Sequence, residues 1–180
     1  MITLCIFVGK MWLSTCMLSE SKRERERMEG LALSGQKVGK VTIKSDCDVF
    51  HQLWKEQQHE IPSLTSNINT CHNLDGEVGC VGYILSWNYI LDGKDYVAKT
   101  QIIDIDEEKN SVTYKVIGGD LQELYKTFVS NVRVETDGSD NIVTWTIDYE
   151  KLSPSVPDPD ALLDFAIKTT KDIETHKLQT

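Results

Sequence analysis

Several patterns that mark large classes of protein are missing from this chain of 180 residues. No apolar run approaches the roughly 18 residues of a membrane-spanning helix. Five cysteines, an odd and scattered set, exclude the dense disulfide framework of small secreted domains. Cations are also few, because 19 lysines and arginines face 28 aspartates and glutamates and leave a net charge of −9. We therefore expect no nucleic-acid partner and no membrane partner.

Motifs of metal and nucleophile chemistry are missing as well. No Cys-x-x-Cys, His-Glu-x-x-His or Gly-x-Ser-x-Gly occurs. Cys47 and His51 are spaced to share a helix face, but a buried thiol is the commoner role for such a cysteine. The glycine-containing turn 75–82 has acidic residues and no lysine, which disfavours phosphate binding. We assign no metal site, no cofactor and no catalytic residue.

The first 27 residues differ from the rest of the chain. All four methionines fall within residues 1–28, and an apolar stretch broken by Lys10 precedes the charged run ESKRERER at 20–27. A secretory signal has the opposite order, with positive charge before the apolar stretch. We expect residues 1–27 to be an extension outside the fold, and residues 28–180 to form one domain of ordinary size.

Period-two alternation separated by turn signals predicts seven strands. The clearest turn is Asp92-Gly93, which is typical of a tight hairpin. The expected strands cover 37–45, 68–74, 81–91, 95–105, 111–117, 125–135 and 142–151. Consecutive strands joined by short turns indicate an antiparallel sheet.

Three helices are expected, two of them between the first and second strands and one after the last strand. Ser45 or Asp46 offers the N-cap of a short helix that runs to about Gln58, and Pro62 can begin a second. A long helix follows the proline-rich segment 154–159 and ends near Lys177, with one apolar face. Helices kept apart from strands in this way favour an α+β fold, in which the last helix covers the sheet.

Several segments resemble one plant family. Residues 81–89 read VGYILSWNY and are followed by DGK at 92–94 and VAK at 97–99. GDLQELYKTF at 119–128 and TKDIET at 170–175 are similar to the same family. The family is that of the major latex (kirola-like) proteins, which belong with the Bet v I-type pathogenesis-related proteins. The resemblance runs from about residue 34 to the C-terminus.

The resemblance implies a helix-grip fold, in which a seven-stranded curved antiparallel sheet surrounds the long C-terminal helix and two short helices follow the first strand. It also implies an internal cavity that binds an apolar small molecule such as a hormone, flavonoid, steroid or terpenoid. The implied protein is cytoplasmic, is associated with plant defence or stress, and is a monomer or else a weak dimer. A cavity-based isomerase or cyclase is the alternative.

Charged residues mark the solvent face of a strand and so identify its inward face. Lys99, Lys115, Arg133 and Asp148 are such markers on four successive strands. With the apolar face of the last helix added, the candidate ligand contacts are Ile84, Tyr96, Ile102, Tyr114, Val116, Phe128, Val132, Trp145, Leu162, Phe165, Ala166 and Thr169. For strand 81–91 the inward face stays open between Tyr83, Leu85, Trp87 and Tyr89 on one side and Ile84, Ser86, Asn88 and Ile90 on the other.

Overall fold

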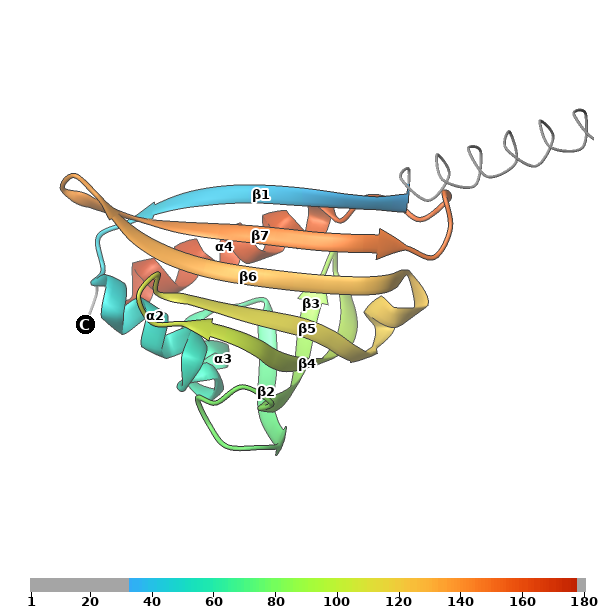
Figure 1. Ribbon diagram of the computed structural model, residues 1–180, viewed down its shortest axis with the longest axis horizontal. Coiled ribbons are helices and arrows are strands. Elements are labelled where there is room, and N and C mark those ends of the chain that lie inside the picture. Colours follow the sequence, from blue (N-terminus) through green and yellow to red (C-terminus); the bar gives the residue numbers. More distant parts are fainter. Residues whose placement is uncertain (1–32, 178–180) are drawn as a thin grey trace, which may run out of the picture. The chain divides into compact units, whose positions relative to one another are not determined.

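One antiparallel sheet of seven strands dominates the computed structural model, which describes residues 33–177 (Figure 1). The strands are β1 Ser34–Ile43, β2 Ile68–Asp75, β3 Ile84–Leu91, β4 Lys94–Asp106, β5 Ser111–Gly119, β6 Tyr125–Asp137 and β7 Asp140–Lys151. Their order in the sheet is β1-β7-β6-β5-β4-β3-β2, so the first strand lies beside the last. The seven predicted strands are confirmed, although their ends shift.

Strand β3 begins three residues late, at Ile84 instead of residue 81. Gly82 has a φ of 99° and interrupts the extended backbone before the strand starts. The amide of Gly82 nevertheless donates to the carbonyl of Ile102 at 2.8 Å, so this turn remains attached to β4.

The helices also lie where the sequence indicated. They are α2 Cys47–Lys55, α3 Ile61–Leu64 and α4 Asp160–Lys177, with 3₁₀ turns η1 Gln58–Glu60 and η2 Asp120–Glu123. Asp46 caps α2, since its carboxylate accepts from the amides of Asp48 at 2.8 Å and Val49 at 3.4 Å. The first helix ends at Lys55, earlier than expected, and η2 connects β5 to β6.

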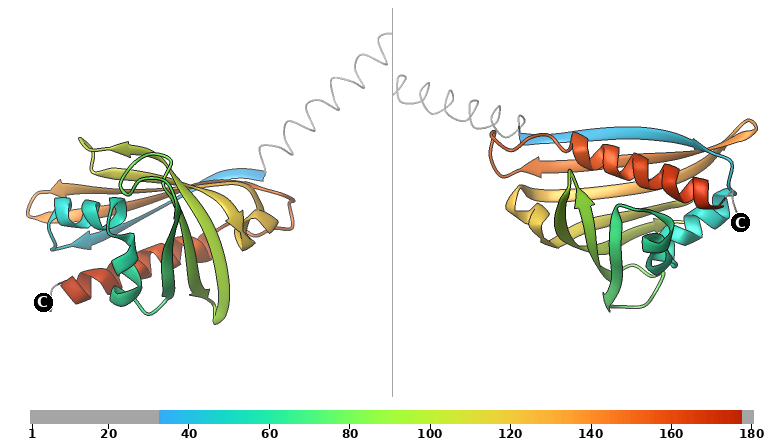
Figure 2. Two further views of the ribbon diagram at one scale, coloured as in Figure 1. Left: turned by 90° about the horizontal axis from the view of Figure 1, so that it is seen from below. Right: turned by 180° about the vertical axis from the view of Figure 1, so that it is seen from behind.

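Helix α4 lies across the concave side of the sheet, and α2 and α3 lie near its C-terminal end (Figure 2). Burial alternates along β7, where Val143, Trp145, Ile147 and Tyr149 are buried against the helix side. The inward faces predicted for β4 to β7 are confirmed by the same alternation. Each fully buried side chain of this size stabilises the fold by about 1.5–3 kcal/mol.

An ionic cluster fixes the approach to α4. Asp158 pairs with Lys151 of β7 at 2.9 Å and with Lys37 of β1 at 3.3 Å, and Lys37 also pairs with Asp160 at 2.8 Å. These contacts lower the pKa of Asp158 to about 2, chiefly through the hydrogen bond from Lys151 and then the one from Tyr149. The start of α4 is thereby tied to the two neighbouring strands β1 and β7.

The predicted boundary between residues 27 and 28 lies outside the described residues. Within residues 33–177, no helix is both long enough and apolar enough to cross a membrane.

Candidate ligand-binding site

A cavity of about 140 Å³ lies between the inner face of the sheet and α4. All strands except β1 contribute to its wall, together with α2, η2 and α4. The lining side chains are Trp54, Ile68, Trp87, Tyr89, Ala98, Thr100, Val116, Leu121, Phe128, Ser130, Trp145, Ile147, Leu162, Phe165, Ala166 and Thr169. Within the described residues, this wall contains no charged side chain.

Aromatic contacts hold the wall in place. Trp54 at the end of α2 meets Trp145 of β7 edge to face, with 4.8 Å between ring centroids. Tyr89 of β3 packs against Phe165 of α4 at 5.2 Å. Such edge-on and tilted pairs are favourable aromatic geometries, so they fix ring positions around the space.

Most polar groups of the wall bond within the protein. Trp87 Nε1 donates to Thr100 Oγ1 at 2.9 Å, and Trp145 Nε1 donates to Thr170 Oγ1 at 2.9 Å. Thr169 Oγ1 donates to the backbone oxygen of Phe165 at 2.9 Å. These bonds pair polar atoms that burial would otherwise leave unsatisfied.

Seven of the twelve candidate contacts line this cavity. They are Val116, Phe128, Trp145, Leu162, Phe165, Ala166 and Thr169. The four helix residues come from one face of α4, as their i, i+3, i+4, i+7 spacing indicates. Their contact with a ligand stays a prediction.

Four further candidates lie on inward faces but outside the cavity wall. Ile102, Tyr114 and Val132 are buried. The Tyr114 hydroxyl donates to the backbone oxygen of Trp54, so it fills the core beneath α2. Tyr96 is half-buried and stacks on Tyr89 at 5.7 Å, which places it beside a wall residue and not in the wall.

The choice of Ile84 requires correction. On β3 the buried residues are Leu85, Trp87 and Tyr89, while Ile84 belongs to the alternate set that faces away from α4. Side chains alternate along a strand, so the burial of Trp87 assigns Ile84 to the opposite face. Trp87 and Tyr89 form the wall in its place.

Trp54, Ile68 and Leu121 were missed as candidates, while Trp87 and Tyr89 belong to the face of strand 81–91 that the sequence left open. Trp54 lies on the buried face of α2, and the sequence did not indicate that this short helix reaches the cavity. Leu121 lies in η2, a turn that hydrophobic periodicity does not reveal. Ala98, Thr100, Ser130 and Ile147 stood on predicted inward faces, and these four also line the wall.

A surface groove of about 400 Å³ lies on the other side of Phe165. The loop before β2, the β3–β4 hairpin and α4 form it through Ser66, Asn67, Ile90, Leu91, Asp92, Gly93, Ala161, Asp164, Phe165 and Lys168. Phe165 lines both this groove and the cavity. Phe165 is therefore the residue that the two walls share.

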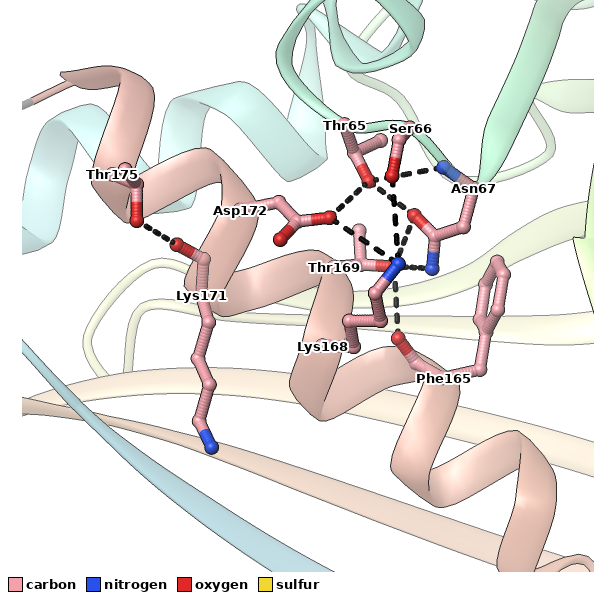
Figure 3. A network of polar contacts seen from close by, with 9 residues as sticks. All are labelled: Thr65, Ser66, Asn67, Phe165, Lys168, Thr169, Lys171, Asp172 and Thr175. Atoms are coloured by element: carbon pink, nitrogen blue, oxygen red, sulfur yellow. Dashed lines mark hydrogen bonds and ion pairs between the residues drawn. The ribbon is translucent and has the colours of Figure 1, made fainter.

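A polar network joins the loop of residues 65–67 to α4, as Figure 3 shows. Thr65 Oγ1 donates to Asp172 Oδ2 at 3.1 Å, and Asn67 Nδ2 donates to Thr169 Oγ1 at 3.1 Å. Lys168 Nζ lies 3.4 Å from Ser66 Oγ. Because Thr169 is also in the cavity wall, the network fixes the helix where the groove and the cavity meet.

Metal ligands do not gather in residues 33–177, where no three His, Cys, Asp or Glu side chains form a metal-binding group. His51 Nε2 lies 3.2 Å from Glu107 Oε2, and Cys47 Sγ lies 3.5 Å from Thr136 Oγ1. Cys47 and His51, the two residues considered above as metal ligands, thus each have another side chain as partner.

Comparison with known proteins places the chain in one family. Residues 32–180 match the model of the pathogenesis-related protein Bet v 1 family. MLP-like protein 34 of Arabidopsis thaliana is 40% identical over 141 residues, which are 77% of this chain and 45% of that protein. MLP-like protein 43 of the same plant is 37% identical over 153 residues, 83% of this chain and 97% of that protein.

The chain thus spans about half the length of MLP-like proteins 34 and 28, and nearly all of MLP-like protein 43. Among solved structures, the major latex-like protein 151 of Panax ginseng superimposes with a TM-score of 0.78 at 49% identity. That match covers 80% of this chain and 97% of the ginseng protein. The sequence, the order of strands and the helix in the curved sheet agree, and this chain therefore belongs to the pathogenesis-related Bet v 1 family, among its major latex protein members.

Proposed function

We propose that this protein binds small apolar molecules in the cavity between the sheet and α4. The observation that carries the proposal is the composition of the wall, where sixteen mainly apolar and aromatic side chains enclose open space without a charged group among the described residues. Ligand sites are typically concave and apolar, with a few placed polar atoms. Membership of the Bet v 1 family supports the same function.

The size of the cavity limits the ligand. About 140 Å³ matches the roughly 150 Å³ cavity that holds a benzene molecule in an engineered protein. Burial of about 200 Å² of apolar surface gains about 5 kcal/mol at 25 cal/mol per Å². Immobilisation of the ligand offsets part of this gain, so we expect micromolar or weaker affinity.

Flavonoid-, steroid- and terpenoid-sized ligands need more space than the cavity alone offers, since the pockets that hold drug-sized molecules measure about 300–1,000 Å³. The groove of about 400 Å³ shares the lining residue Phe165 with the cavity. We propose that such ligands enter when the Phe165 ring turns aside and joins the groove to the cavity.

Isothermal titration with ethylbenzene and naphthalene tests both steps. The intact protein should bind ethylbenzene with a saturable heat and naphthalene more weakly. Phe165→Ala should lower the dissociation constant of naphthalene by on the order of tenfold, because the ligand no longer has to displace the Phe165 ring. A tenfold change corresponds to about 1.4 kcal/mol of binding free energy. Leu163→Ala is the matched control, since Leu163 also lies on α4 but outside the wall. If neither ethylbenzene nor naphthalene binds to the intact protein or to either variant, the proposal is refuted.

Catalysis receives less support from the wall than binding does. The wall has no Asp, Glu, His or Lys within the described residues. Burial raises the pKa of the Tyr89 hydroxyl far above its ordinary value, so it stays protonated near neutral pH. A proton-transfer step needs a group that titrates near the working pH. Mass spectrometry should therefore recover a bound ligand unchanged after incubation.

The likeness to major latex proteins also supports three finer proposals: a cytoplasmic location, a role in defence or stress, and a monomeric state. We propose in addition that residues 28–180 fold without residues 1–27. Untargeted mass spectrometry of compounds that co-purify with the native protein would identify its ligand. N-terminal sequencing of the same preparation would show whether residues 1–27 are present.

A further inference from the structure

Ser130 contributes a hydroxyl to the cavity wall at a position where the neighbouring inward side chains are apolar. On β6 the inward positions before and after it are Phe128 and Val132, and both are buried. In the sheet Ser130 lies opposite Tyr114 of β5 and Ile147 of β7. Cross-strand partners point to the same face of a sheet, and both of these partners are buried on the concave side. The Ser130 side chain therefore points towards the cavity, whose wall it joins.

The Ser130 hydroxyl makes no hydrogen bond with any of residues 33–177. Two other polar groups of the wall, Trp54 Nε1 and the Tyr89 hydroxyl, also have no partner there, but protein atoms enclose both and they do not face the open space. Ser130 is half-buried, and its oxygen is not enclosed in this way. Because the side chain points towards the cavity, its accessible hydroxyl faces the space that a ligand would occupy.

The two threonine hydroxyls of the wall each accept a hydrogen bond already. Thr100 Oγ1 accepts from Trp87 Nε1 at 2.9 Å, and Thr169 Oγ1 accepts from Asn67 Nδ2 at 3.1 Å. Ser130 differs from both, because its hydroxyl has neither a donor nor an acceptor as partner in the part of the chain that the structure describes. A serine hydroxyl can both donate and accept. A polar group on a ligand can therefore bond to it in either direction.

A hydroxyl in this position lowers the affinity of the cavity for a purely apolar ligand. A hydrocarbon that covers Ser130 removes its access to water and supplies no hydrogen bond in return, which has a cost in free energy. A hydroxyl or carbonyl group on the ligand restores the hydrogen bond. A charged group has no such advantage, because the described wall contains no charged side chain to pair with it.

We propose that Ser130 is a specificity-determining residue of the cavity, and that its hydroxyl bonds to an uncharged hydroxyl or carbonyl group on the ligand. This proposal rests on the binding function proposed above. The cavity of about 140 Å³ holds one ring with a short substituent. The favoured ligands are therefore small single-ring alcohols and ketones, in preference to hydrocarbons of the same shape.

Three probes with the same carbon skeleton test the proposal: ethylbenzene, α-methylbenzyl alcohol and acetophenone. Isothermal titration of each compound into the intact full-length protein and into Ser130→Ala gives the dissociation constants. Each compound is compared with itself between the two proteins, so the hydration of the free ligand cancels. Ser130→Ala should weaken the alcohol and the ketone by about fivefold, which corresponds to about 1 kcal/mol. Ethylbenzene should bind as tightly as before or more tightly.

Two further variants serve as controls. Ser86→Ala removes a half-buried hydroxyl from the same sheet, but Ser86 belongs to the face of β3 that points away from α4, outside the wall. All three dissociation constants should stay unchanged in this variant. Ser130→Thr keeps a hydroxyl in the wall, so the ratio of the constants for ethylbenzene and acetophenone should stay within about twofold of the ratio in the intact protein. Circular dichroism verifies that each variant is folded.

The outcomes distinguish this proposal from the broader one. If Ser130→Ala changes the constants of all three probes by the same factor, selection by Ser130 is wrong while apolar binding stands. If Ser86→Ala weakens the alcohol and the ketone as much as Ser130→Ala does, the assignment to the cavity is wrong. If none of the three probes binds the intact protein, both proposals fail together.

Discussion

At Gly119 the backbone adopts a φ of 90°, a left-handed conformation that favours glycine. A Cβ atom at this position would overlap the carbonyl oxygen of Val97 on β4. Strand β5 approaches β4 closely here, and Gly119 pairs with Ala98 at the end of the ladder. The residue thus combines a conformational requirement with a steric one, directly before the turn η2 that brings Leu121 into the cavity wall.

Gly119→Ala should therefore lower the free energy of unfolding by about 3 kcal/mol or more, because strain and backbone overlap add. Gly93→Ala is the control, since Gly93 has a φ of 74° but open space around its Cα. It should cost only about 1–2 kcal/mol. Urea unfolding measures both variants. Equal losses would show that the close approach to Val97 contributes nothing.

Tyr89 and Tyr125 make a second residue-level comparison, because both are buried and only Tyr125 has a partner for its hydroxyl among residues 33–177. Tyr89→Phe should raise the free energy of unfolding of the ligand-free protein by about 1 kcal/mol, since it removes an unsatisfied buried group. Tyr125→Phe should lower it by about 1 kcal/mol. Changes of the same sign in chemical denaturation would contradict the assignment of Tyr89 as unpaired.

The ionic cluster at the start of α4 gives an element-scale prediction about pH. The pKa of Asp158 falls from 3.8 to about 2 in the folded protein, so its carboxylate stabilises the fold above about pH 4. That stabilisation decreases as the pH falls from 4 towards 2. Asp158→Asn should lower the thermal midpoint at pH 6, and its difference from the unmodified protein should disappear near pH 2.

Asp104→Asn serves as the control for this experiment, because Asp104 is an exposed residue on β4 away from the cluster. Its substitution should leave the thermal midpoint nearly unchanged at both pH values. If Asp158→Asn lowered the midpoint equally at pH 6 and pH 2, the pairs with Lys151 and Lys37 would not be its source of stability.

The network between loop 65–67 and α4 gives a second element-scale prediction. Asn67→Ala should lower the free energy of unfolding by about 2 kcal/mol, because the buried Thr65 and Thr169 each lose a hydrogen bond with the Asn67 side chain. Hydrogen exchange should quicken around residues 165–172, where α4 borders the groove. Ser66→Ala is the control, since Ser66 is exposed and should cost less than about 0.5 kcal/mol. Unaltered exchange in Asn67→Ala would show that the loop does not hold the helix.

The strands and the inward faces of β4 to β7 could be predicted from the sequence, whereas the inward face of β3 could not. On β4 to β7, charged residues such as Lys99 and Lys115 mark the solvent side, and alternation then gives the buried side. Strand β3 carries no charged residue, so apolar character alone did not separate Ile84 from Leu85. The curvature that brings Trp54 of α2 opposite Trp145 of β7 depends on contacts far apart in the sequence. Local patterns therefore predicted the strands and most inward faces, but not the extent of the open space.

At the scale of the whole molecule, the tryptophans should report ligand binding. Three of the four, Trp54, Trp87 and Trp145, line the cavity, and Trp12 lies outside the described residues. A ligand in the cavity contacts these indoles directly, so intrinsic emission should change saturably during an ethylbenzene titration. Protein unfolded in urea should show no such change. Calorimetric binding without a change in emission would place the ligand elsewhere.

The pairing of β1 with β7 bears on how the chain acquires its structure in the cell. About a hundred residues separate the two strands, and at roughly 5–20 residues per second the ribosome needs several seconds to deliver the second after the first. During that interval β1 has no strand β7 to pair with. Such distant pairing slows folding in general. A chaperone that shields a nascent β1 would thus protect this protein during translation.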